Sequence, residues 1–407
     1  MNRDRPSRPM ERLGDMKKEA PAPKAKKQKK SNPLLRLLAL VVTAALVLGA
    51  LVLVVYRDEL NLDALKRWLA YRSLTTSETG QAQPFTHAGG DKLSLAYLES
   101  SALLASSAGA HYYSLTGEKY AEEVLALENP VLSASATAGV VYDAGGQSLF
   151  LFRKGQETFS LTLEGGGDLL SARVNDSGWL TVTAQQSGYK GVVTVYNAEG
   201  GQVIQISLSS TFVVDAALSP DCKTVAVITM GQEEGSFYSR VLFYPVDQTE
   251  PSAQVSLGGT TALDLDYEEE QLWILGEDRL LTVEPEEGSV QTYSFGRLYL
   301  KGCSLGGDGF ALLLLGRYRA GSASLAVTIS PQGEVLAQTD LTAQVLDFDS
   351  AGRYCALLTG SSLTVLSQDL TPYSTLESTM GARYTALASD GSALLADDQE
   401  LWLYLPQ

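Results

Sequence analysis

The pentapeptide at residues 302–306, Gly-Cys-Ser-Leu-Gly, matches the G-x-S-x-G pattern of a nucleophile elbow. Such an elbow places its serine on a turn between a strand and a helix, and the catalytic histidine follows the serine in the chain. Here a short apolar stretch typical of a strand follows, and the chain has no histidine after His111. We therefore assign no catalytic role to Ser304.

Metal-binding patterns are also incomplete. The segment Asp347–Gly352 begins like a calcium loop but lacks the remaining ligands. It is more typical of a turn between strands, where Asp and Gly suit the backbone geometry. With only His87 and His111 in the chain, a His-rich metal site is excluded, and no P-loop, H-E-x-x-H or C-x-x-C motif occurs.

The other reactive side chains have simpler interpretations. Three cysteines, Cys222, Cys303 and Cys355, are too few for a disulfide framework. The last two fall in or beside apolar stretches and are expected to be small buried hydrophobes. The run 268–271 predicts a solvated hairpin turn, and the sequon at 175–177 predicts a turn within a repeat. We therefore predict no catalytic, cofactor-binding or metal-binding residue, no cofactor, and no enzyme; a carboxylate-based hydrolase remains a minor alternative.

Charge divides the 407-residue chain into unequal parts. Residues 1–36 hold twelve Lys or Arg and four acidic residues, a net charge of +8. The remainder holds 19 basic and 43 acidic residues, a net charge of −24. Between the charged blocks, residues 37–56 form an uncharged apolar run of twenty residues, long enough as a helix to cross about 30 Å of hydrocarbon.

This apolar run predicts a membrane anchor. It is longer than the core of a signal peptide, and Tyr56 and Arg57 follow it instead of a cleavage site. A buried core helix would show a polar face, which the run lacks apart from Thr43. The lysine cluster at 24–30 lies just before the run, so the N-terminus is predicted to be cytoplasmic and the long C-terminal part extracytoplasmic.

Four segments follow from these patterns. Residues 1–33 are predicted to be a disordered, basic cytoplasmic tail, with no role in nucleic-acid binding, and residues 34–56 a transmembrane helix. Residues 57–81 are predicted to form an amphipathic stalk helix and a linker, with Trp68 and Tyr71 suited to the membrane interface. Residues 82–407 are predicted to form an extracytoplasmic domain.

The last segment consists of repeats. Apolar stretches of four to seven residues alternate with Gly, Asp, Asn and Ser clusters, a pattern typical of an all-β protein. Units begin near residues 92, 131, 169, 212, 261, 298, 343 and 383, which gives eight units of about 41 residues in 81–407. We predict an eight-bladed β-propeller, with seven blades as the alternative.

The last unit holds one strand too few. An orphan stretch, Gln83–His87, precedes the first unit. A propeller closes its ring without an open sheet edge when an N-terminal strand completes the final blade. We therefore predict that 83–87 forms the outer strand of the blade built from 385–405.

The repeats resemble known propellers. The turn Ser219–Asp221 between apolar strands resembles that of WD40-like and TolB-like repeats, and the hairpins 195–203 and 327–335 resemble quinoprotein-type repeats. The chain lacks the Trp-Asp dipeptide and the repeat-ending Trp, so the resemblance implies a fold and no quinone. From about residue 24 onward, the chain resembles a family of uncharacterised membrane-anchored propeller proteins of Gram-positive bacteria.

Two functions remain open. The first is a non-catalytic protein-interaction scaffold at the cell envelope, with an extracytoplasmic protein partner. The second is a sensor of a glycan or small molecule, or a carboxylate-dependent glycan-active enzyme, that uses the mouth of the propeller. Convergent, partly buried carboxylates in the central funnel would favour the enzyme, and scattered exposed ones would favour the scaffold.

Overall fold

The computed structural model describes residues 38, 40–44, 47, 48, 62–268, 271–285 and 287–406. The chain divides into two units, residues 1–61 and 62–407. In the first unit, the described residues are helical and exposed. Among all described residues, none belongs to a helix long and apolar enough to span a bilayer. The predicted basic tail and most of the predicted span lie outside the described residues.

Residues 62–407 form an all-β, eight-bladed propeller in the described part of the chain, each blade a four-stranded antiparallel sheet. Blade 1 contains β2 (Ser94–Leu98), β3 (Ser101–Ser106), β4 (Gly109–Ser114) and β5 (Lys119–Val124). Blade 2 contains β6 (Pro130–Ala134), β7 (Ala138–Asp143), β8 (Ser148–Arg153) and β9 (Gln156–Thr162). Blade 3 contains β10 (Asp168–Val174), β11 (Leu180–Gln185), β12 (Gly191–Tyr196) and β13 (Gln202–Leu208). Blade 4 contains β14 (Phe212–Leu218), β15 (Thr224–Glu233), β16 (Ser236–Pro245) and β17 (Ala253–Gly258).

The remaining four blades follow in chain order. Blade 5 contains β18 (Ala262–Glu268), β19 (Gln271–Gly276), β20 (Arg279–Glu284) and β21 (Ser289–Ser294). Blade 6 contains β22 (Tyr299–Gly307), β23 (Phe310–Gly316), β24 (Leu325–Ile329) and β25 (Val335–Asp340). Blade 7 contains β26 (Val345–Ala351), β27 (Tyr354–Thr359), β28 (Leu363–Ser367) and β29 (Pro372–Leu376). Blade 8 contains β30 (Tyr384–Leu387), β31 (Ala393–Ala396) and β32 (Glu400–Tyr404), with β1 (Phe85–Thr86) as its outer strand.

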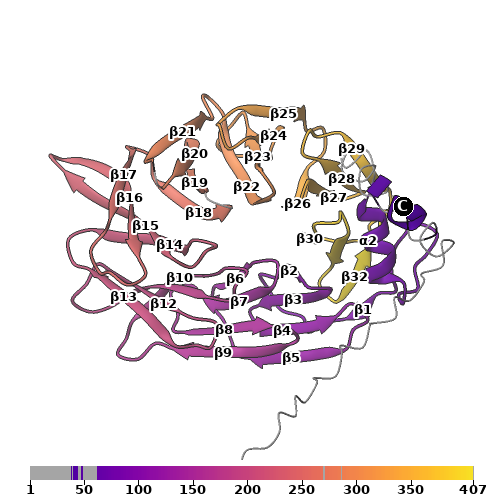
Figure 1. Ribbon diagram of the computed structural model, residues 1–407, viewed down its shortest axis with the longest axis horizontal. Coiled ribbons are helices and arrows are strands. Elements are labelled where there is room, and N and C mark those ends of the chain that lie inside the picture. The colour runs from indigo at the N-terminus through magenta and orange to yellow at the C-terminus, as the bar shows by residue number, and fades with distance from the viewer. Residues whose placement is uncertain are drawn as a thin grey trace, which may run out of the picture. The chain divides into compact units, whose positions relative to one another are not determined.

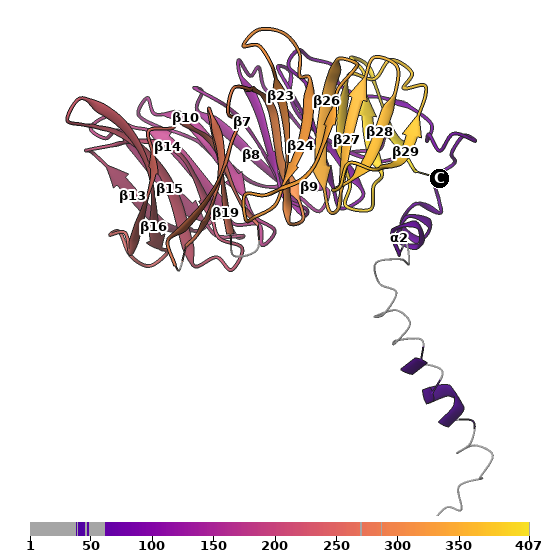
Figure 2. The same ribbon diagram turned by 90° about the horizontal axis from the view of Figure 1, so that it is seen from above.

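The first strand of every blade lies nearest the centre of the ring (Figure 1). Because neighbouring strands are antiparallel, the turns from first to second strand and from third to fourth strand lie on one face. We call this the mouth face. The other turns and the links between blades lie on the opposite face, and Figure 2 shows the strands running between the two faces.

Blade 8 closes the ring as the sequence predicts. Phe85 lies opposite Leu401, and Thr86 opposite Glu400, in an antiparallel pair. The Ala82 N–H donates to the carbonyl of Leu403 (2.8 Å). The predicted closure by residues 83–87 and the count of eight blades are both confirmed, and the seven-bladed alternative is wrong.

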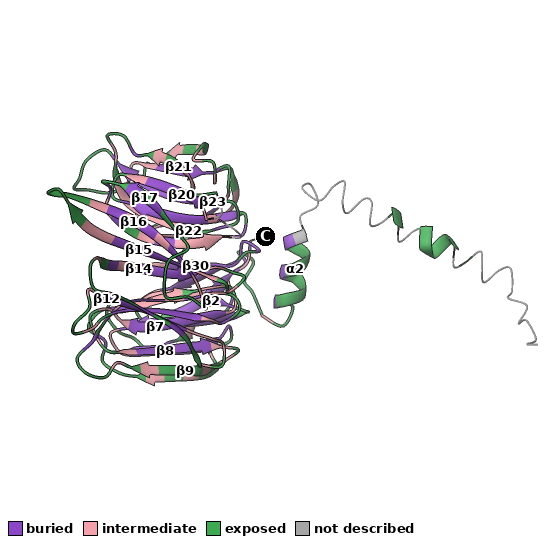
Figure 3. Ribbon diagram, turned by 60° about the vertical axis from the view of Figure 1, so that its left-hand side comes forward, coloured by how far each residue is buried: buried purple, intermediate pink, exposed green. Residues whose placement is uncertain are grey.

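Apolar packing between blades holds the ring together. The buried residues form eight clusters in the described chain, and each cluster joins two neighbouring blades. Blades 8 and 1, which meet at the joint where the ring closes, share such a cluster. In it, Leu104 of β3 packs with Leu394 of β31 and Leu403 of β32. Figure 3 shows the buried strands inside each blade and the exposed outer strands and turns. Alternating side chains on each strand thus face two neighbouring blades, which explains the regular apolar stretches in the sequence.

One helix packs beside the ring. Helix α2 (Leu62–Tyr71) lies within residues 57–81, for which the sequence pattern predicts an amphipathic helix and a linker. It packs on the propeller instead of standing apart as a stalk. Tyr71, expected at the membrane interface, is buried against the propeller, and only 4% of its surface is exposed.

Candidate functional site

A cavity of about 670 Å³ lies at the mouth face, between the innermost strands. The ends of these strands and the turns after them form its walls. Its charged lining is mostly acidic: Glu99, Asp176, Asp266, Glu268, Asp308 and Asp349, against Arg173. The carboxylates come from blades 1, 3, 5, 6 and 7, so the fold gathers acidic residues that are far apart in the chain.

A β-bulge near the start of the innermost strand helps to aim these side chains. In blades 3 to 7 this strand holds one extra residue near its start, where the pairing with its partner strand shifts. An aspartate follows the extra residue in three of them: Asp215, Asp264 and Asp347. In each case, one carboxylate oxygen accepts a hydrogen bond from the next backbone N–H, at 2.8–2.9 Å. Bulges redirect side chains in this way and interrupt pairing at a sheet edge.

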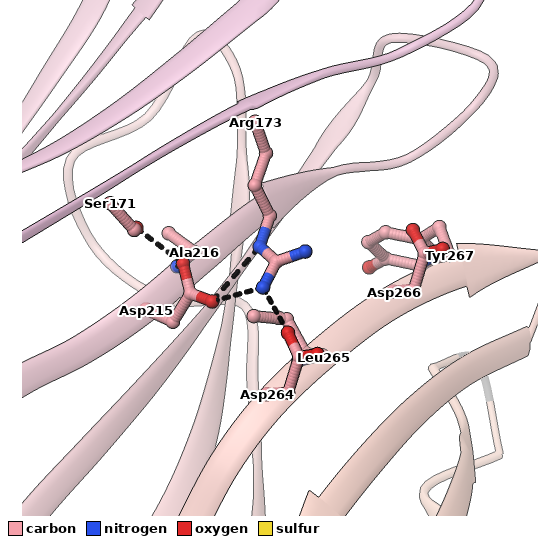
Figure 4. Close-up of polar contacts among 8 residues, drawn as sticks. All are labelled: Ser171, Arg173, Asp215, Ala216, Asp264, Leu265, Asp266 and Tyr267. Carbon is pink, nitrogen blue, oxygen red and sulfur yellow. Dashed lines mark hydrogen bonds and ion pairs between the residues drawn. The ribbon is translucent and has the colours of Figure 1, made fainter. Parts of the chain in front are cut away.

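Arg173 connects three blades at the centre (Figure 4). Its Nε and Nη2 donate to Asp215 Oδ2 at 2.9 and 2.5 Å. Its Nη2 also contacts Asp264 of blade 5, and Ser171 donates to the other oxygen of Asp215. Burial alone would lower the pKa of Arg173. The negative charges of Asp215 and Asp264 have the larger effect, so the pKa of Arg173 is raised. The arginine neutralises carboxylates that would otherwise repel each other in a poorly solvated place.

Two aspartates of β26 join blade 7 to blade 8. The backbone N–H of Thr385 donates to Asp347 (2.7 Å), and that of Leu387 donates to Asp349 (2.8 Å). These N–H groups lie on the edge strand β30 and would otherwise lack a strand partner. Burial raises the pKa of both aspartates to about 6. The sequence pattern predicted a turn at 347–352, but both aspartates lie within β26.

Asp266 differs from these aspartates. The carboxylate of Asp266 accepts a hydrogen bond from the backbone N–H of the next residue, Tyr267 (2.9 Å). Among the described residues, it has no hydrogen bond to another blade. Burial raises its pKa to about 7; the attraction of Arg173 lowers it, and the repulsion of Asp264 raises it. Asp266 is therefore a cavity carboxylate that titrates near neutral pH.

Hydrogen bonds between blades also fix the rim of the cavity. The Ala136 N–H of blade 2 donates to Asp176 of blade 3 (2.8 Å). The Asp308 N–H of blade 6 donates to the carbonyl of Gly352 in blade 7 (2.7 Å). Gly352 has a positive φ of 57°, and a Cβ there would lie 2.7 Å from the carbonyl oxygen of Ser389. The mouth is thus a preorganised surface.

The sequence motifs have structural places. Residues 302–306 lie within the strand β22, where Ser304 donates to Asp349 (3.2 Å). Glu268 ends β18, is partly buried, and accepts a hydrogen bond from the indole of Trp273 (3.1 Å) and one from the Gly309 N–H. The prediction of a solvated turn is therefore wrong for Glu268, and residues 269 and 270 lie outside the described residues.

The remaining motifs conform to their expected places. Asn175 begins the turn between β10 and β11, and its carbonyl accepts from Gly178 (2.9 Å). Cys355 is buried, with its pKa raised to about 12 by burial, and Cys303 is partly buried. All three cysteines are free, and the described residues contain no group of three or more His, Cys, Asp or Glu side chains that could hold a metal.

The network around Arg173 was not found from the sequence. A signal does exist: two apolar residues and an aspartate recur at Val213–Asp215, Ala262–Asp264 and Val345–Asp347. Each triplet opens an innermost strand and marks the bulge. The partner of these aspartates could not be found in this way, because Arg173 is separated from Asp264 by 91 residues.

The pKa of Asp266 gives a test of this electrostatic arrangement. Its folded-state pKa lies above the ordinary value of 3.8, so the folded chain holds a proton that the unfolded chain has lost. The contribution of Asp266 to stability therefore falls as pH rises from about 4 to about 7 and is constant above pH 7. We expect Asp266→Asn to remove part of this slope and to raise the unfolding free energy at pH 8 by about 1 kcal/mol or more.

Thermal unfolding at pH 5, 6, 7 and 8 measures this effect, with the exposed Asp247→Asn as the matched control. The control should keep the wild-type slope. A D266N variant with an unchanged slope and a lower Tm at pH 8 would contradict the assignment.

These features define an eight-bladed β-propeller with an acidic cavity at one mouth of its central channel. Residues 71–283 match the model of a family of unknown function, DUF5711, and the chain belongs to this family. No curated protein has a significantly similar sequence.

Solved propellers share the fold. The chain is similar to the C-terminal WD40 domain of Sif2, with 13% identity and a TM-score of 0.55, over 79% of this chain and 98% of that one. It is also similar to the computationally designed Ika8 protein, with 10% identity and a TM-score of 0.55, over 78% and 97% of the two chains. BamB from Moraxella catarrhalis matches with 12% identity and a TM-score of 0.47, over 80% and 99%. At such identities, the similarity concerns the fold alone.

Proposed function

We propose that this protein is a membrane-anchored propeller that acts as a non-catalytic protein-interaction scaffold at the cell envelope. One helix at 34–56 holds it in the membrane, with the N-terminus in the cytoplasm and residues 82–407 on the extracytoplasmic side. The uncharged run at 37–56 and the basic residues before it support this topology. The Gram-positive origin implied by the family resemblance is part of the same proposal.

The observation that carries the scaffold role is the state of the mouth carboxylates. They converge on the cavity, as an acid–base enzyme would require, yet most of them are used as hydrogen-bond acceptors within the ring. Asp349 accepts from Leu387, Ser350 and Ser304 through its two oxygens. A glycosidase needs two carboxylates free to act on the substrate, one as acid and one as base or nucleophile. A preorganised acidic rim is better suited to binding.

The partner is inferred from charge. Six carboxylates and one arginine line the cavity, and that arginine is paired with Asp215 and Asp264. Such a surface attracts Lys- and Arg-bearing segments, and the attraction weakens as salt screens the charges. We propose a protein partner that presents a basic segment to the mouth face.

A cationic small-molecule ligand is the second candidate. The cavity volume of about 670 Å³ lies within the usual range of ligand sites, roughly 300–1,000 Å³. Asp266, which lacks a bond to another blade in the described residues, is a carboxylate available for such a ligand.

Binding of an oligolysine peptide to the purified full chain tests the charge proposal. We expect binding that weakens at least tenfold between 50 and 300 mM salt, on the order expected for several screened charges. The double variant E99Q/D176N on the mouth face should weaken it several-fold. The matched variant E234Q/E277Q, on turns of the opposite face, should leave it unchanged.

Equal effects of the two double variants would show that the total charge, and not the mouth, attracts the peptide. Turnover of a cell-wall glycan that is lost in D266N would instead identify an enzyme.

A further inference from the structure

Helix α2 binds the propeller through one polar face. Asp63, Arg67 and Tyr71 are spaced four residues apart, so they share one side of the helix. These three side chains are buried, with exposed fractions of 4–8%. The position of α2 is therefore set by specific contacts.

The first contact is an ion pair with blade 7. Asp63 Oδ2 accepts a hydrogen bond from the Tyr354 hydroxyl (2.9 Å) and pairs with Arg353 (2.9 Å). Burial alone would raise the pKa of Asp63, but the bonds from Tyr354 and Lys66 and the charge of Arg353 lower it. Asp63 is thus held in its ionised form.

The other two contacts reach blades 7, 8 and 1. Arg67 donates to the Tyr373 hydroxyl (2.6 Å) and to the carbonyl of Asp390. The hydroxyl of Tyr71 lies 2.7 Å from that of Tyr97. The helix therefore bridges the joint at which the ring closes.

The outward face of α2 is apolar. Leu65, Trp68 and Leu69 expose 55%, 64% and 55% of their surfaces, and Arg72 continues the same stripe. Lys66 is exposed beside the stripe. Trp and Leu with flanking basic residues are typical of a helix that lies in a membrane interface.

The length of the chain before α2 indicates what covers this face. The apolar run ends at Tyr56 and α2 begins at Leu62, so five residues separate them. An extended chain of this length spans about 20 Å. If the run crosses the bilayer as proposed, α2 cannot lie far from the outer leaflet.

The site of docking relates α2 to the cavity. Its partners Tyr97, Arg353 and Asp390 lie in or directly beside the first-to-second-strand turns of blades 1, 7 and 8. Tyr97, Gly352 and Ser389 of the same segments line the cavity. Helix α2 therefore lies on the mouth face, next to segments that line the cavity.

We propose that Leu65, Trp68 and Leu69 insert into the outer interface of the lipid bilayer, so that α2 holds the propeller with its cavity mouth toward the membrane. This inference rests on the proposed membrane anchor. It restricts the partner of the mouth to a basic segment close to the membrane surface.

Quenching of tryptophan fluorescence by lipid tests the insertion. The full chain is reconstituted in phosphatidylcholine–phosphatidylglycerol vesicles with or without bromine on the acyl chains, and flotation confirms that it is bound. We expect brominated lipid to quench the wild type and the Trp68→Phe variant to lose at least half of that quenching. The other three tryptophans provide the background: Trp273 and Trp402 are buried in the propeller, and Trp179 is partly buried.

Flotation with equal quenching of the wild type and W68F would overturn the insertion of α2 alone. Failure to float would overturn the proposed anchor and this inference together.

A second measurement tests the orientation. S177C lies on the mouth face and S210C on the opposite face, both at exposed positions, and each is made in a C222S background. A donor dye on each is paired with acceptor-labelled lipid headgroups in the same vesicles. We expect more energy transfer from S177C than from S210C; equal or reversed transfer would overturn the orientation.

Discussion

Replacing residues 81–88 by a Gly/Ser segment of equal length is expected to lower the Tm of the propeller by about 10 °C. The replacement removes β1 and leaves β32 as an open sheet edge. Half-buried Phe85 no longer covers the apolar cluster of the closing joint. Each lost backbone hydrogen bond costs on the order of 1 kcal/mol, and exposed apolar surface adds about 25 cal/mol per Å².

Calorimetry of the full chain measures this effect, with two controls. Deletion of 1–31, and a Gly/Ser replacement of the exposed loop 317–321, should each leave the Tm of the propeller within about 2 °C of the wild type. A replacement at 81–88 with no larger effect than these controls would show that β1 does not hold the ring closed.

Arg173→Met is expected to destabilise the propeller by about 3 kcal/mol. Removal of one partner from a buried ionic network typically costs about 3–5 kcal/mol, because the remaining charges are left uncompensated. The low end applies here because 43% of the Asp264 side chain is exposed to solvent. Here Asp215 and Asp264 would face each other without the guanidinium that joins them. Urea unfolding measures the loss, and R317M, at an exposed arginine, is the control.

A rescue experiment separates charge from packing. If uncompensated charge is the cause, the triple variant R173M/D215N/D264N should recover a substantial part of the stability lost in R173M. Equal losses in R173M and the triple variant would instead mean that the arginine acts through packing and hydrogen bonds alone.

The architecture could be predicted because it depends on local patterns. Each blade needs apolar strands of four to seven residues separated by turns, and the eight expected unit starts lie within a few residues of the observed innermost strands. Closure followed from counting strands, because blade 8 lacked one and residues 83–87 had no other partner. The blades and the closing strand are therefore visible in the order of residues along the chain.

The site could not be predicted in this way because its residues come from different blades and are brought together only by the fold. Arg173, Asp215 and Asp264 belong to three blades and meet only once the ring has formed. Glu268 illustrates the same limit, since it resembles a solvated turn residue until the Gly309 N–H of the next blade binds it.

The helix shows a related limit. Its amphipathic pattern was visible, but spacing alone could not show which face docks on the propeller. Tyr71 suits a membrane interface by residue type, yet its hydroxyl pairs with Tyr97 and it is buried. Trp68, on the other side of the helix, retains the exposed position.

The most direct test of the central claim, a propeller held outside the membrane by one helix, is labelling of single cysteines in intact cells. S210C on the propeller and S31C before the apolar run are compared in a C222S background, with a maleimide that cannot cross membranes. We expect S210C to be labelled in intact cells and S31C to be labelled only after the membrane is permeabilised. Labelling of S31C in intact cells, or protection of S210C until permeabilisation, would contradict the claim.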